Sequence, residues 1–185
     1  MTTEPLEQAI ASTRSVLAAV KKEQLGNDTP CANWKVSDLI NHIVSGQEFF
    51  TSGVSGAPRD ESETDFAAGD YVAAFDEGTA QCLSAFRGEG AMDRTLTLPF
   101  GQMPGSAFMM LATTDTFTHG WDLAKATGQD TNLAADLASE ILDGARQSIM
   151  PAFRSEDGAV FGPEKTAPQG ACPADQLAAF LGRSV

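Results

Sequence analysis

The sequence predicts an all-α protein: a bundle of four long helices followed by an irregular tail. Three observations lead to this fold class. Apolar residues recur at steps of three and four over long segments, and Gly and Pro interrupt those segments at their ends. Strict alternation of apolar residues is confined to a short extended segment near 94–101. The length fits a single domain over 1–185, with the bundle at about 5–150 and the tail at 151–185.

The first two helices are predicted from their apolar faces and their ends. The first is expected at about 5–24, before the break at Gly26, and it has one apolar face: Leu6, Ile10, Thr13, Leu17 and Val20. The second is expected to start near Ser37 as its N-cap, and its inner face carries Leu39, Ile43, Gly46 and Phe50. The stretch TSGVSGAPRDESETD at 51–65 then reads as a polar loop.

Three further helices and a short terminal helix complete the expected order. The third is expected to begin between Phe66 and Asp70, and its face carries Tyr71, Phe75, Cys82 and Phe86. The fourth is expected at about 106–127 with Gly128 as its C-terminal stop, and the fifth at about 133–150 before a proline. The Pro- and Gly-rich tail is expected to close with a short helix in LAAFLGR.

Composition excludes several classes of partner. The chain has 25 acidic and 12 basic residues and a formal charge of -13, which argues against nucleic acid and against anionic membrane surfaces. No segment has the apolar length of a membrane span or the pattern of a signal peptide. Its three widely spaced cysteines form no CxxC pair, so a reduced, cytoplasmic protein is expected. The oligomeric state, monomer or homodimer, stays open.

The fourth helix carries the residues with chemical potential. At 100° per residue, Asp115, His119 and Asp122 share one stripe with apolar residues, while Phe117 and Trp121 belong to a second apolar stripe opposite. A helix that is apolar on two sides is expected to be buried on both. Ionisable groups in such a stripe are costly unless they are paired or bind a cation.

The other histidine of the chain, His42, lies at the edge of the inner face of the second helix. If the second and fourth helices face each other, His42, Asp115 and His119 converge as three metal ligands. Three protein ligands leave a fourth position open, which is typical of catalytic zinc. Two alternatives stay open: Asp115 and His119 as a plain ion pair within one helix, and His42 as an ordinary histidine at the edge of the core.

Four more side chains belong to this hypothesis. Asp122 lies on the same helical face as His119, so its carboxylate could accept a hydrogen bond from the ring nitrogen that does not bind the metal. The alternative role of Asp122 is an ion pair with a Lys or Arg. Trp34 and Phe100 are candidates for the wall of a pocket at the open position. Cys31 is either a ligand or nucleophile or a packed loop thiol, and its role stays open.

Four stretches, TPCANWKVSDLINHIV, LPFGQMPG, HGWDLAKATGQ and FGPE with ADQLAAFLGR, resemble the actinobacterial DinB-like metal-binding proteins. These are related to the metal-binding N-terminal domain of mycothiol-dependent maleylpyruvate isomerase. The resemblance implies a four-helix bundle with one divalent ion, commonly zinc or nickel, at positions that match His42, Asp115 and His119. The family's acid is usually glutamate, and this chain has Asp115. Isomerase activity is not implied, because that enzyme has a further C-terminal domain.

The resemblance also implies a function. It suggests a low-molecular-weight thiol such as mycothiol as cosubstrate and a small electrophile as the second substrate. The preferred hypothesis is therefore a thiol-dependent transferase with one divalent ion, zinc first and nickel second. Two alternatives stay open: a non-catalytic metal-binding or stress-related module, and a metal-dependent hydrolase that uses water as its nucleophile.

Overall fold

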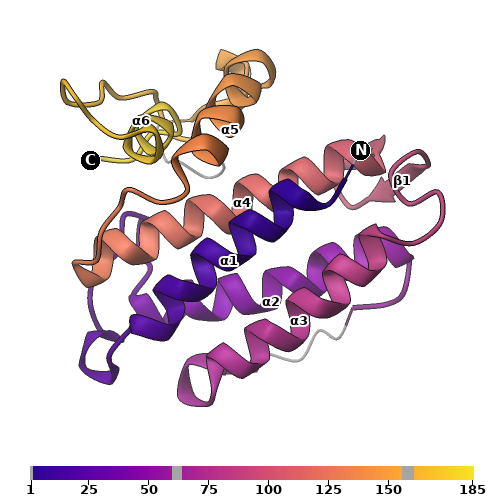
Figure 1. The fold of residues 1–185 in the computed structure, drawn as a ribbon, viewed down its shortest axis with the longest axis horizontal. Coiled ribbons are helices and arrows are strands. Elements are labelled where there is room, and N and C mark those ends of the chain that lie inside the picture. The colour runs from indigo at the N-terminus through magenta and orange to yellow at the C-terminus, as the bar shows by residue number, and fades with distance from the viewer. Residues whose placement is uncertain (1, 60–63, 156–160) are drawn as a thin grey trace.

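The computed structural model describes residues 2–59, 64–155 and 161–185, and it is mainly helical. Four long helices lie side by side in a bundle (Figure 1): α1 (Glu4–Ala19), α2 (Val36–Ser55), α3 (Tyr71–Phe86) and α4 (Gly105–Thr127). The predicted all-α class is confirmed. The sequence predicts that the first helix reaches residue 24 and that the third begins between Phe66 and Asp70. In the structure, short 3-10 turns at Lys22–Gln24 and Phe66–Ala68 occupy these positions instead.

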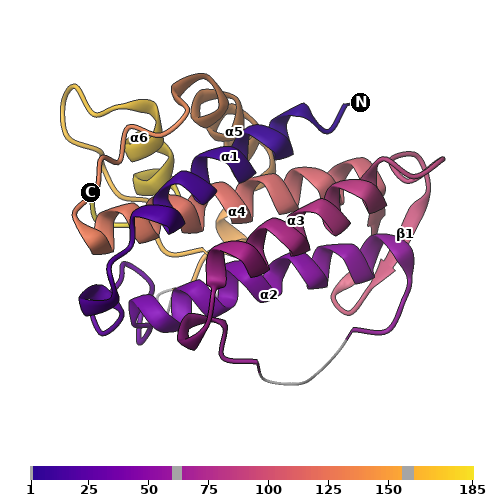
Figure 2. The same cartoon turned by 60° about the horizontal axis from the view of Figure 1, so that its bottom comes forward.

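The direction of each helix follows from its contacts. Early α2 lies beside late α4, where His42 meets His119, and late α2 lies beside early α4, where Gly53 meets Phe108. These two helices are therefore antiparallel and face each other. α1 and α4 run in the same direction, and α2 and α3 run in the opposite one (Figures 1 and 2). The long connection between α2 and α3 makes this arrangement feasible, since parallel neighbours need a crossover.

α4 is buried on two opposite sides, as its two apolar stripes predict. Phe108 and Ala112 belong to the hydrophobic core of the bundle. Phe117 and Trp121 face a second core that α4 shares with the C-terminal part of the chain. The Trp121 indole also donates a 2.9 Å hydrogen bond from Nε1 to the carboxylate of Asp175. The middle of α4 is thus held from both sides, which fixes the residues between them.

The start of α2 differs from the expectation. Its N-cap is Lys35, whose backbone N–H donates a 2.8 Å hydrogen bond to the Asp38 carboxylate. The expectation that Ser37 is the N-cap is wrong, because Ser37 already lies in the first helical turn. An acid in that turn can satisfy a free N–H and also suits the helix dipole. Asp38 therefore has a structural role at the helix end.

The expectation of a loop from residue 51 is wrong for residues 51–55. α2 continues to Ser55, and Gly56 ends it in the left-handed region at φ 73°. Val54, only 2% exposed, holds this last turn in the core of the bundle, so packing outweighs the polar composition. Residues 60–63 of the expected loop and 156–160 of the expected tail lie outside the described residues.

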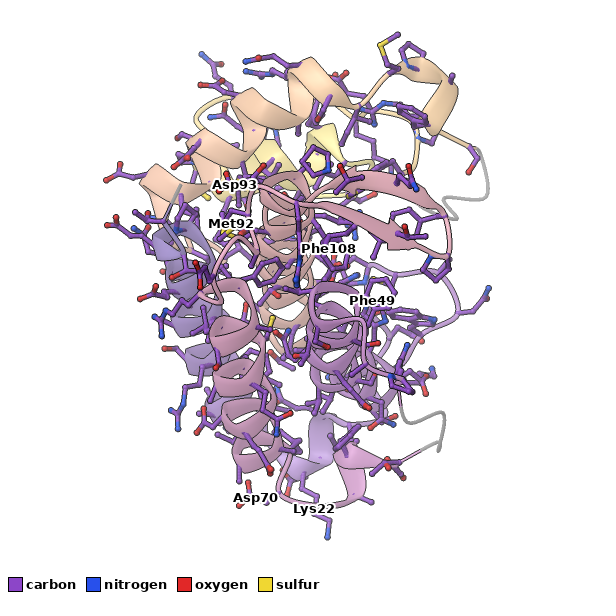
Figure 3. The ribbon with its side chains drawn as sticks, turned by 90° about the vertical axis from the view of Figure 1, so that its right-hand side faces the viewer. Lys22, Phe49, Asp70, Met92, Asp93 and Phe108 are labelled. Carbon is purple, nitrogen blue, oxygen red and sulfur yellow. The ribbon has the colours of Figure 1, made fainter. Side chains whose placement is uncertain are left out.

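A β-hairpin stands at the end of the bundle where α2 stops and α4 begins (Figure 3). Its antiparallel strands are β1 (Thr95–Leu98) and β2 (Gly101–Pro104), with Leu96 opposite Met103. The expected extended segment is confirmed as β1. β2 has no apolar alternation in its GQMP sequence, so the periodicity that reveals β1 does not reveal its partner.

The C-terminal part forms a layer of its own over α4. α5 (Ala135–Ser148) packs on α6 (Pro173–Phe180), and both lie on the side of the bundle away from α2 and α3 (Figures 1 and 2). The expected short terminal helix exists but begins four residues earlier than LAAFLGR. Arg154 anchors its end through hydrogen bonds from Nη1 to the carbonyls of Phe180, at 2.7 Å, and Gly162, at 2.9 Å.

Among the described residues, none of the helices combines the length and the apolar character that crossing a membrane requires.

The crossing of α1 and α4 depends on Gly120. A Cβ atom there would overlap the Thr13 side chain and lie 3.3 Å from the Thr13 Cα. Gly120→Ala is therefore expected to lower the free energy of unfolding by about 1–3 kcal/mol, because both helices must separate. Urea unfolding measures this change.

Gly144→Ala in α5 is the matched control. Nothing lies within 4 Å of a Cβ at this position, so the substitution is expected to raise the free energy of unfolding by about 0.5–1 kcal/mol through helix propensity. Equal effects of the two variants would contradict the close approach at Gly120.

Candidate metal centre

Three side chains from α2 and α4 meet at the surface between these helices. The Asp115 Oδ1 atom lies 3.9 Å from the Nε2 atom of His42 and 3.6 Å from the Nε2 atom of His119. The two imidazole centroids are 4.6 Å apart in an edge-to-face arrangement. Side-chain exposure is 37% for His42, 30% for Asp115 and 13% for His119. The cluster is therefore open to solvent from the α2 side and closed on the other.

The three donor atoms fit a divalent cation. They lie within 4.8 Å of one another, and two ligands on a tetrahedral zinc ion at about 2.1 Å would be about 3.4 Å apart. The His42 Nε2 atom is buried and has no hydrogen-bond partner in the described part of the chain. A buried imidazole nitrogen without a partner is costly, and a cation at this position would satisfy it.

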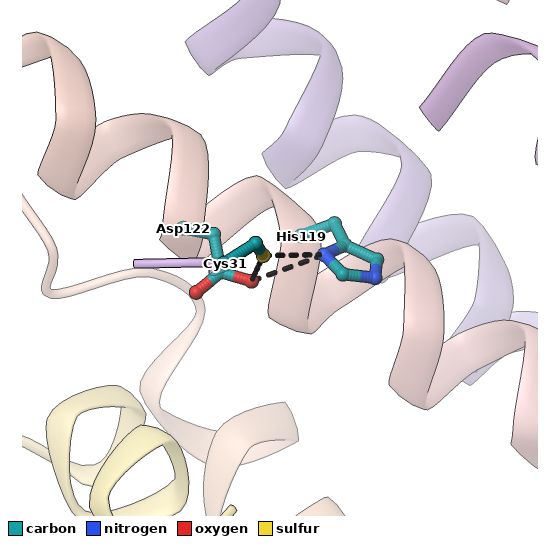
Figure 4. Close-up of side chains that lie close together, drawn as sticks. All are labelled: Cys31, His119 and Asp122. Carbon is teal, nitrogen blue, oxygen red and sulfur yellow. Dashed lines mark hydrogen bonds and ion pairs between the residues drawn. The ribbon is translucent and has the colours of Figure 1, made fainter. Parts of the chain in front are cut away.

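The second nitrogen of His119 is also accounted for. Its Nδ1 atom lies 3.0 Å from the Asp122 Oδ2 atom (Figure 4). Because an ionised carboxylate only accepts hydrogen bonds, Nδ1 carries the hydrogen and the lone pair of the neutral ring is on Nε2. That nitrogen faces Asp115 and His42. A carboxylate behind a histidine is the usual support of a metal-binding imidazole.

Asp122 is completely buried and holds three partners at once. Besides His119, the Cys31 thiol donates to Oδ2 across 3.2 Å. The Arg183 guanidinium donates from Nε to Oδ1 at 3.2 Å and from Nη2 to Oδ2 at 3.0 Å. Both roles considered for Asp122 from the sequence, support of the imidazole and an ion pair with a basic residue, therefore coexist in the structure.

The loop before α2 places Cys31 and Trp34 beside the imidazoles. The Thr29 hydroxyl donates to the carbonyl oxygens of both residues, at 3.1 Å and 3.0 Å, and accepts from the Cys31 N–H at 3.2 Å. Asn33 adopts φ 65°, a left-handed conformation that asparagine tolerates well. The Trp34 ring then lies with its centroid 4.7 Å from that of His42 and 5.9 Å from that of His119.

The electrostatics of the cluster follow from burial and neighbouring charge. Burial alone would lower the pKa of His119, but Asp122, Cys31 and Asp115 outweigh it and raise this pKa to about 10. Burial alone would raise the pKa of Asp122, but His119 and Arg183 lower it to about 2. The pKa of Asp115 is also lowered, because both imidazoles outweigh its burial. Both carboxylates are therefore ionised at neutral pH.

The structure brings together most of the side chains singled out in the sequence. His42, Asp115 and His119 converge, Asp122 supports His119, and Trp34 covers both rings. Phe100 lies elsewhere: it is 57% exposed in the hairpin, with its ring 6.4 Å from that of Phe49.

Arg183 is the functional candidate that the sequence does not reveal, because it lies 61 residues after Asp122 and helical spacing does not show contacts between segments so far apart.

A second group of donors includes Cys31, His119 and Asp122, which also lie within 4.8 Å of one another. The Arg183 guanidinium already contacts both oxygens of the Asp122 carboxylate, so a positive group occupies this side. The Nδ1 hydrogen of His119 also points toward Asp122 rather than offering a lone pair. This group is therefore suited to supporting His119 and less suited to binding a cation of its own.

Fold and cluster together define a class of helical-bundle protein in which two imidazoles and a carboxylate from antiparallel helices face one another. Residues 6–124 match the family model of the mycothiol maleylpyruvate isomerase N-terminal domain. The chain belongs to this family. The matched region contains the bundle through most of α4, including all three candidate ligands.

Two relatives of known sequence span nearly the whole chain. The chain is 43% identical over 171 residues to the uncharacterised proteins MT0763 and Rv0738 from two strains of Mycobacterium tuberculosis, which covers 92% of this chain and 91% of each relative.

The crystal structure of the mycothiol-dependent maleylpyruvate isomerase superimposes with a TM-score of 0.54 at 15% identity, over 76% of this chain and 68% of the enzyme. A mutant of that enzyme gives a TM-score of 0.57 at 14% identity, over 80% of this chain and 71% of the mutant.

Proposed function

We propose that His42, Asp115 and His119 bind one divalent ion, zinc in preference to nickel, and that the protein is a mycothiol-dependent transferase acting on a small electrophile. The observation that carries this proposal is the convergence of two imidazole Nε2 atoms and a carboxylate oxygen around one point, with His42 Nε2 otherwise without a partner. The family assignment supports the thiol, since its name refers to mycothiol. Mixed nitrogen and oxygen ligands suit zinc.

The chain's own residues would prepare the site for a thiol. Asp122 keeps the hydrogen of His119 on Nδ1 and so presents Nε2. Trp34 covers the two imidazoles on one side, which limits access of water. A bound divalent ion would lower the pKa of a coordinated thiol and hold its sulfur in place. The exposed side of the cluster, next to His42 and Asp115, is where thiol and electrophile would enter.

The space for an electrophile is expected along α2 toward the hairpin. Phe49 lies seven residues after His42 on the same helix, which corresponds to about 10 Å of rise. It lines a cavity together with Gly53, Leu98 and Pro99 near the tip of the hairpin. Phe100 would contribute here through its contact with Phe49 rather than at the ion itself.

The cytoplasm is the expected location, because Cys31, Cys82 and Cys172 are all free thiols and thiols persist in compartments that are kept reduced.

Calorimetry of the zinc-loaded protein with mycothiol tests this function. We expect one thiol to bind per chain with release of a proton, seen as a dependence of the heat on the ionisation enthalpy of the buffer. S-methyl mycothiol, which has no thiol proton, is the matched control and is expected to bind at least about tenfold more weakly. Binding of neither ligand would favour a metal-dependent hydrolase or a metal-binding module without turnover.

Asp122→Asn is expected to keep one ion per chain while it reduces mycothiol affinity or turnover by about tenfold or more. The amide oxygen can still accept the hydrogen of His119 Nδ1, but the negative charge behind the ring is lost. Metal content is measured by elemental analysis and thiol affinity by calorimetry.

Asp175→Asn is the matched control for this prediction, because Asp175 accepts a hydrogen bond from the other side of α4, at Trp121. It is expected to leave thiol affinity unchanged. Complete loss of the ion in Asp122→Asn would contradict a purely supporting role for Asp122.

A further inference from the structure

The supporting carboxylate of the candidate centre is held by the C-terminal end of the chain. Arg183 follows α6 and reaches Asp122 with two nearly parallel hydrogen bonds, Nε to Oδ1 at 3.2 Å and Nη2 to Oδ2 at 3.0 Å. The side chains are 14% and 0% exposed, respectively. Such a two-pronged contact fixes the plane of a carboxylate as well as its position.

The orientation of that plane matters for His119. The Oδ2 atom that accepts from Arg183 Nη2 is the same atom that lies 3.0 Å from His119 Nδ1 and 3.2 Å from the Cys31 sulfur. A rotation of the Asp122 carboxylate would therefore break its contact with the imidazole. The imidazole would then lose the partner that directs its Nε2 lone pair toward His42 and Asp115.

The charge of Asp122 also requires Arg183. A fully buried carboxylate is strongly disfavoured without a cation beside it. His119 cannot serve as that cation while its Nε2 atom is a metal ligand, because the ring is then neutral. Among the described residues, Arg183 is then the one positively charged side chain in contact with Asp122.

We propose that Arg183 is a positioning residue of the metal centre, which acts through Asp122 to orient His119. The inference rests on the proposed function for the ion itself. Arg183 lies outside the region that matches the family model, which ends at residue 124. The proposal gives the C-terminal segment a functional role at a site whose three proposed ligands all lie in the bundle.

The test compares three variants of the full-length protein. Arg183→Met removes the charge at similar length, and Arg183→Lys keeps the charge but not the two-pronged contact. Arg154→Met is the control, because Arg154 anchors the same segment through the Phe180 and Gly162 carbonyls and contacts no part of the centre. Circular dichroism and thermal unfolding show whether each variant folds. If Arg183→Met does not fold, the comparison of Arg183→Lys with the wild type decides the outcome.

Two measurements are made on each variant. The first is zinc affinity by competition with a chelator. We expect Arg183→Met to bind zinc about 10- to 100-fold more weakly, which is the usual effect of losing a partner behind a ligand. The zinc affinity of Arg183→Lys is expected to lie between those of the wild type and Arg183→Met. The zinc affinity of Arg154→Met is expected to stay within about twofold of the wild type, although its melting temperature falls.

The second measurement uses metal-free protein and nuclear magnetic resonance of the His119 ring. We expect the Nδ1 hydrogen to exchange slowly with water in the wild type and in Arg154→Met, and at least about tenfold faster in Arg183→Met. Unchanged exchange and affinity in Arg183→Met, or an equal loss in Arg154→Met, would overturn the role of Arg183. A wild type that binds no zinc would overturn the proposed function, and the exchange rates alone would then decide on Arg183.

Discussion

His119→Ala and His42→Ala are each expected to lower zinc affinity by more than about 100-fold. Losing only a partner behind a ligand costs about 10- to 100-fold, and here a proposed ligand itself is removed. Neither loss has a ready replacement, because these are the two histidines of the chain. The carboxylate of Asp122 is committed to Arg183. Chelator competition and elemental analysis of protein purified without a histidine tag measure the change.

Asp38→Asn is the matched control for these variants. Asp38 stands four residues before His42, the same spacing as Asp115 before His119, but its carboxylate accepts from the Lys35 N–H at the start of α2. The substitution is expected to cost about 1 kcal/mol of stability or less and to leave zinc binding unchanged. Full metal content in both histidine variants would show that the ion is held elsewhere or that no specific site exists.

The sequence predicts much of the candidate cluster because Asp115, His119 and Asp122 depend on helical periodicity. Asp115, His119 and Asp122 share a face at any helical geometry close to ideal, and His42 joins them once α2 and α4 pack together. Gly128 also marks the end of α4 as expected, at φ 68°. Local rules of spacing and capping are sufficient for Asp115, His119, Asp122 and Gly128, whereas the position of His42 also requires the packing of α2 against α4.

The remaining features depend on contacts that leave no signal in the periodicity or composition of their own segments. Arg183 reaches Asp122 only because α6 packs on the far side of α4, and nothing in its neighbouring residues indicates that contact. β2 forms because β1 offers it a partner. Ser55 is helical because Val54 is buried, although the composition around it is typical of a loop. For Arg183 and Val54 the contacts come from residues distant in the sequence, whereas β2 pairs with the neighbouring strand β1.

Zinc affinity is expected to rise with pH, by about tenfold per unit between pH 7 and 9. In the metal-free protein the pKa of His119 is raised to about 10, so its ring is protonated at neutral pH. Zinc needs the lone pair of Nε2 and must displace that proton, and one proton released corresponds to a tenfold gain per unit. The slope is measured by chelator competition, with the known protonation of the chelator taken into account.

The stability of the metal-free protein is expected to change in the opposite direction. A group whose pKa is raised on folding, from 6.5 to about 10 for His119, adds stability that is fully present below pH 6.5. This contribution declines as the pH rises toward 10, because the unfolded protein has already lost the proton that the folded protein still holds.

Urea unfolding of metal-free protein between pH 6 and pH 10 measures this decline. His119→Gln, whose side chain cannot be charged, is the control and is expected not to show the decline. The two pH dependences have one cause, the proton on Nε2 of His119, which stabilises the empty site and competes with zinc. Zinc affinity that does not change over this range, together with metal-free stability that also does not change, would show that His119 is already neutral at pH 7. In that case the Asp115 and Asp122 carboxylates would orient the His119 ring without raising its pKa.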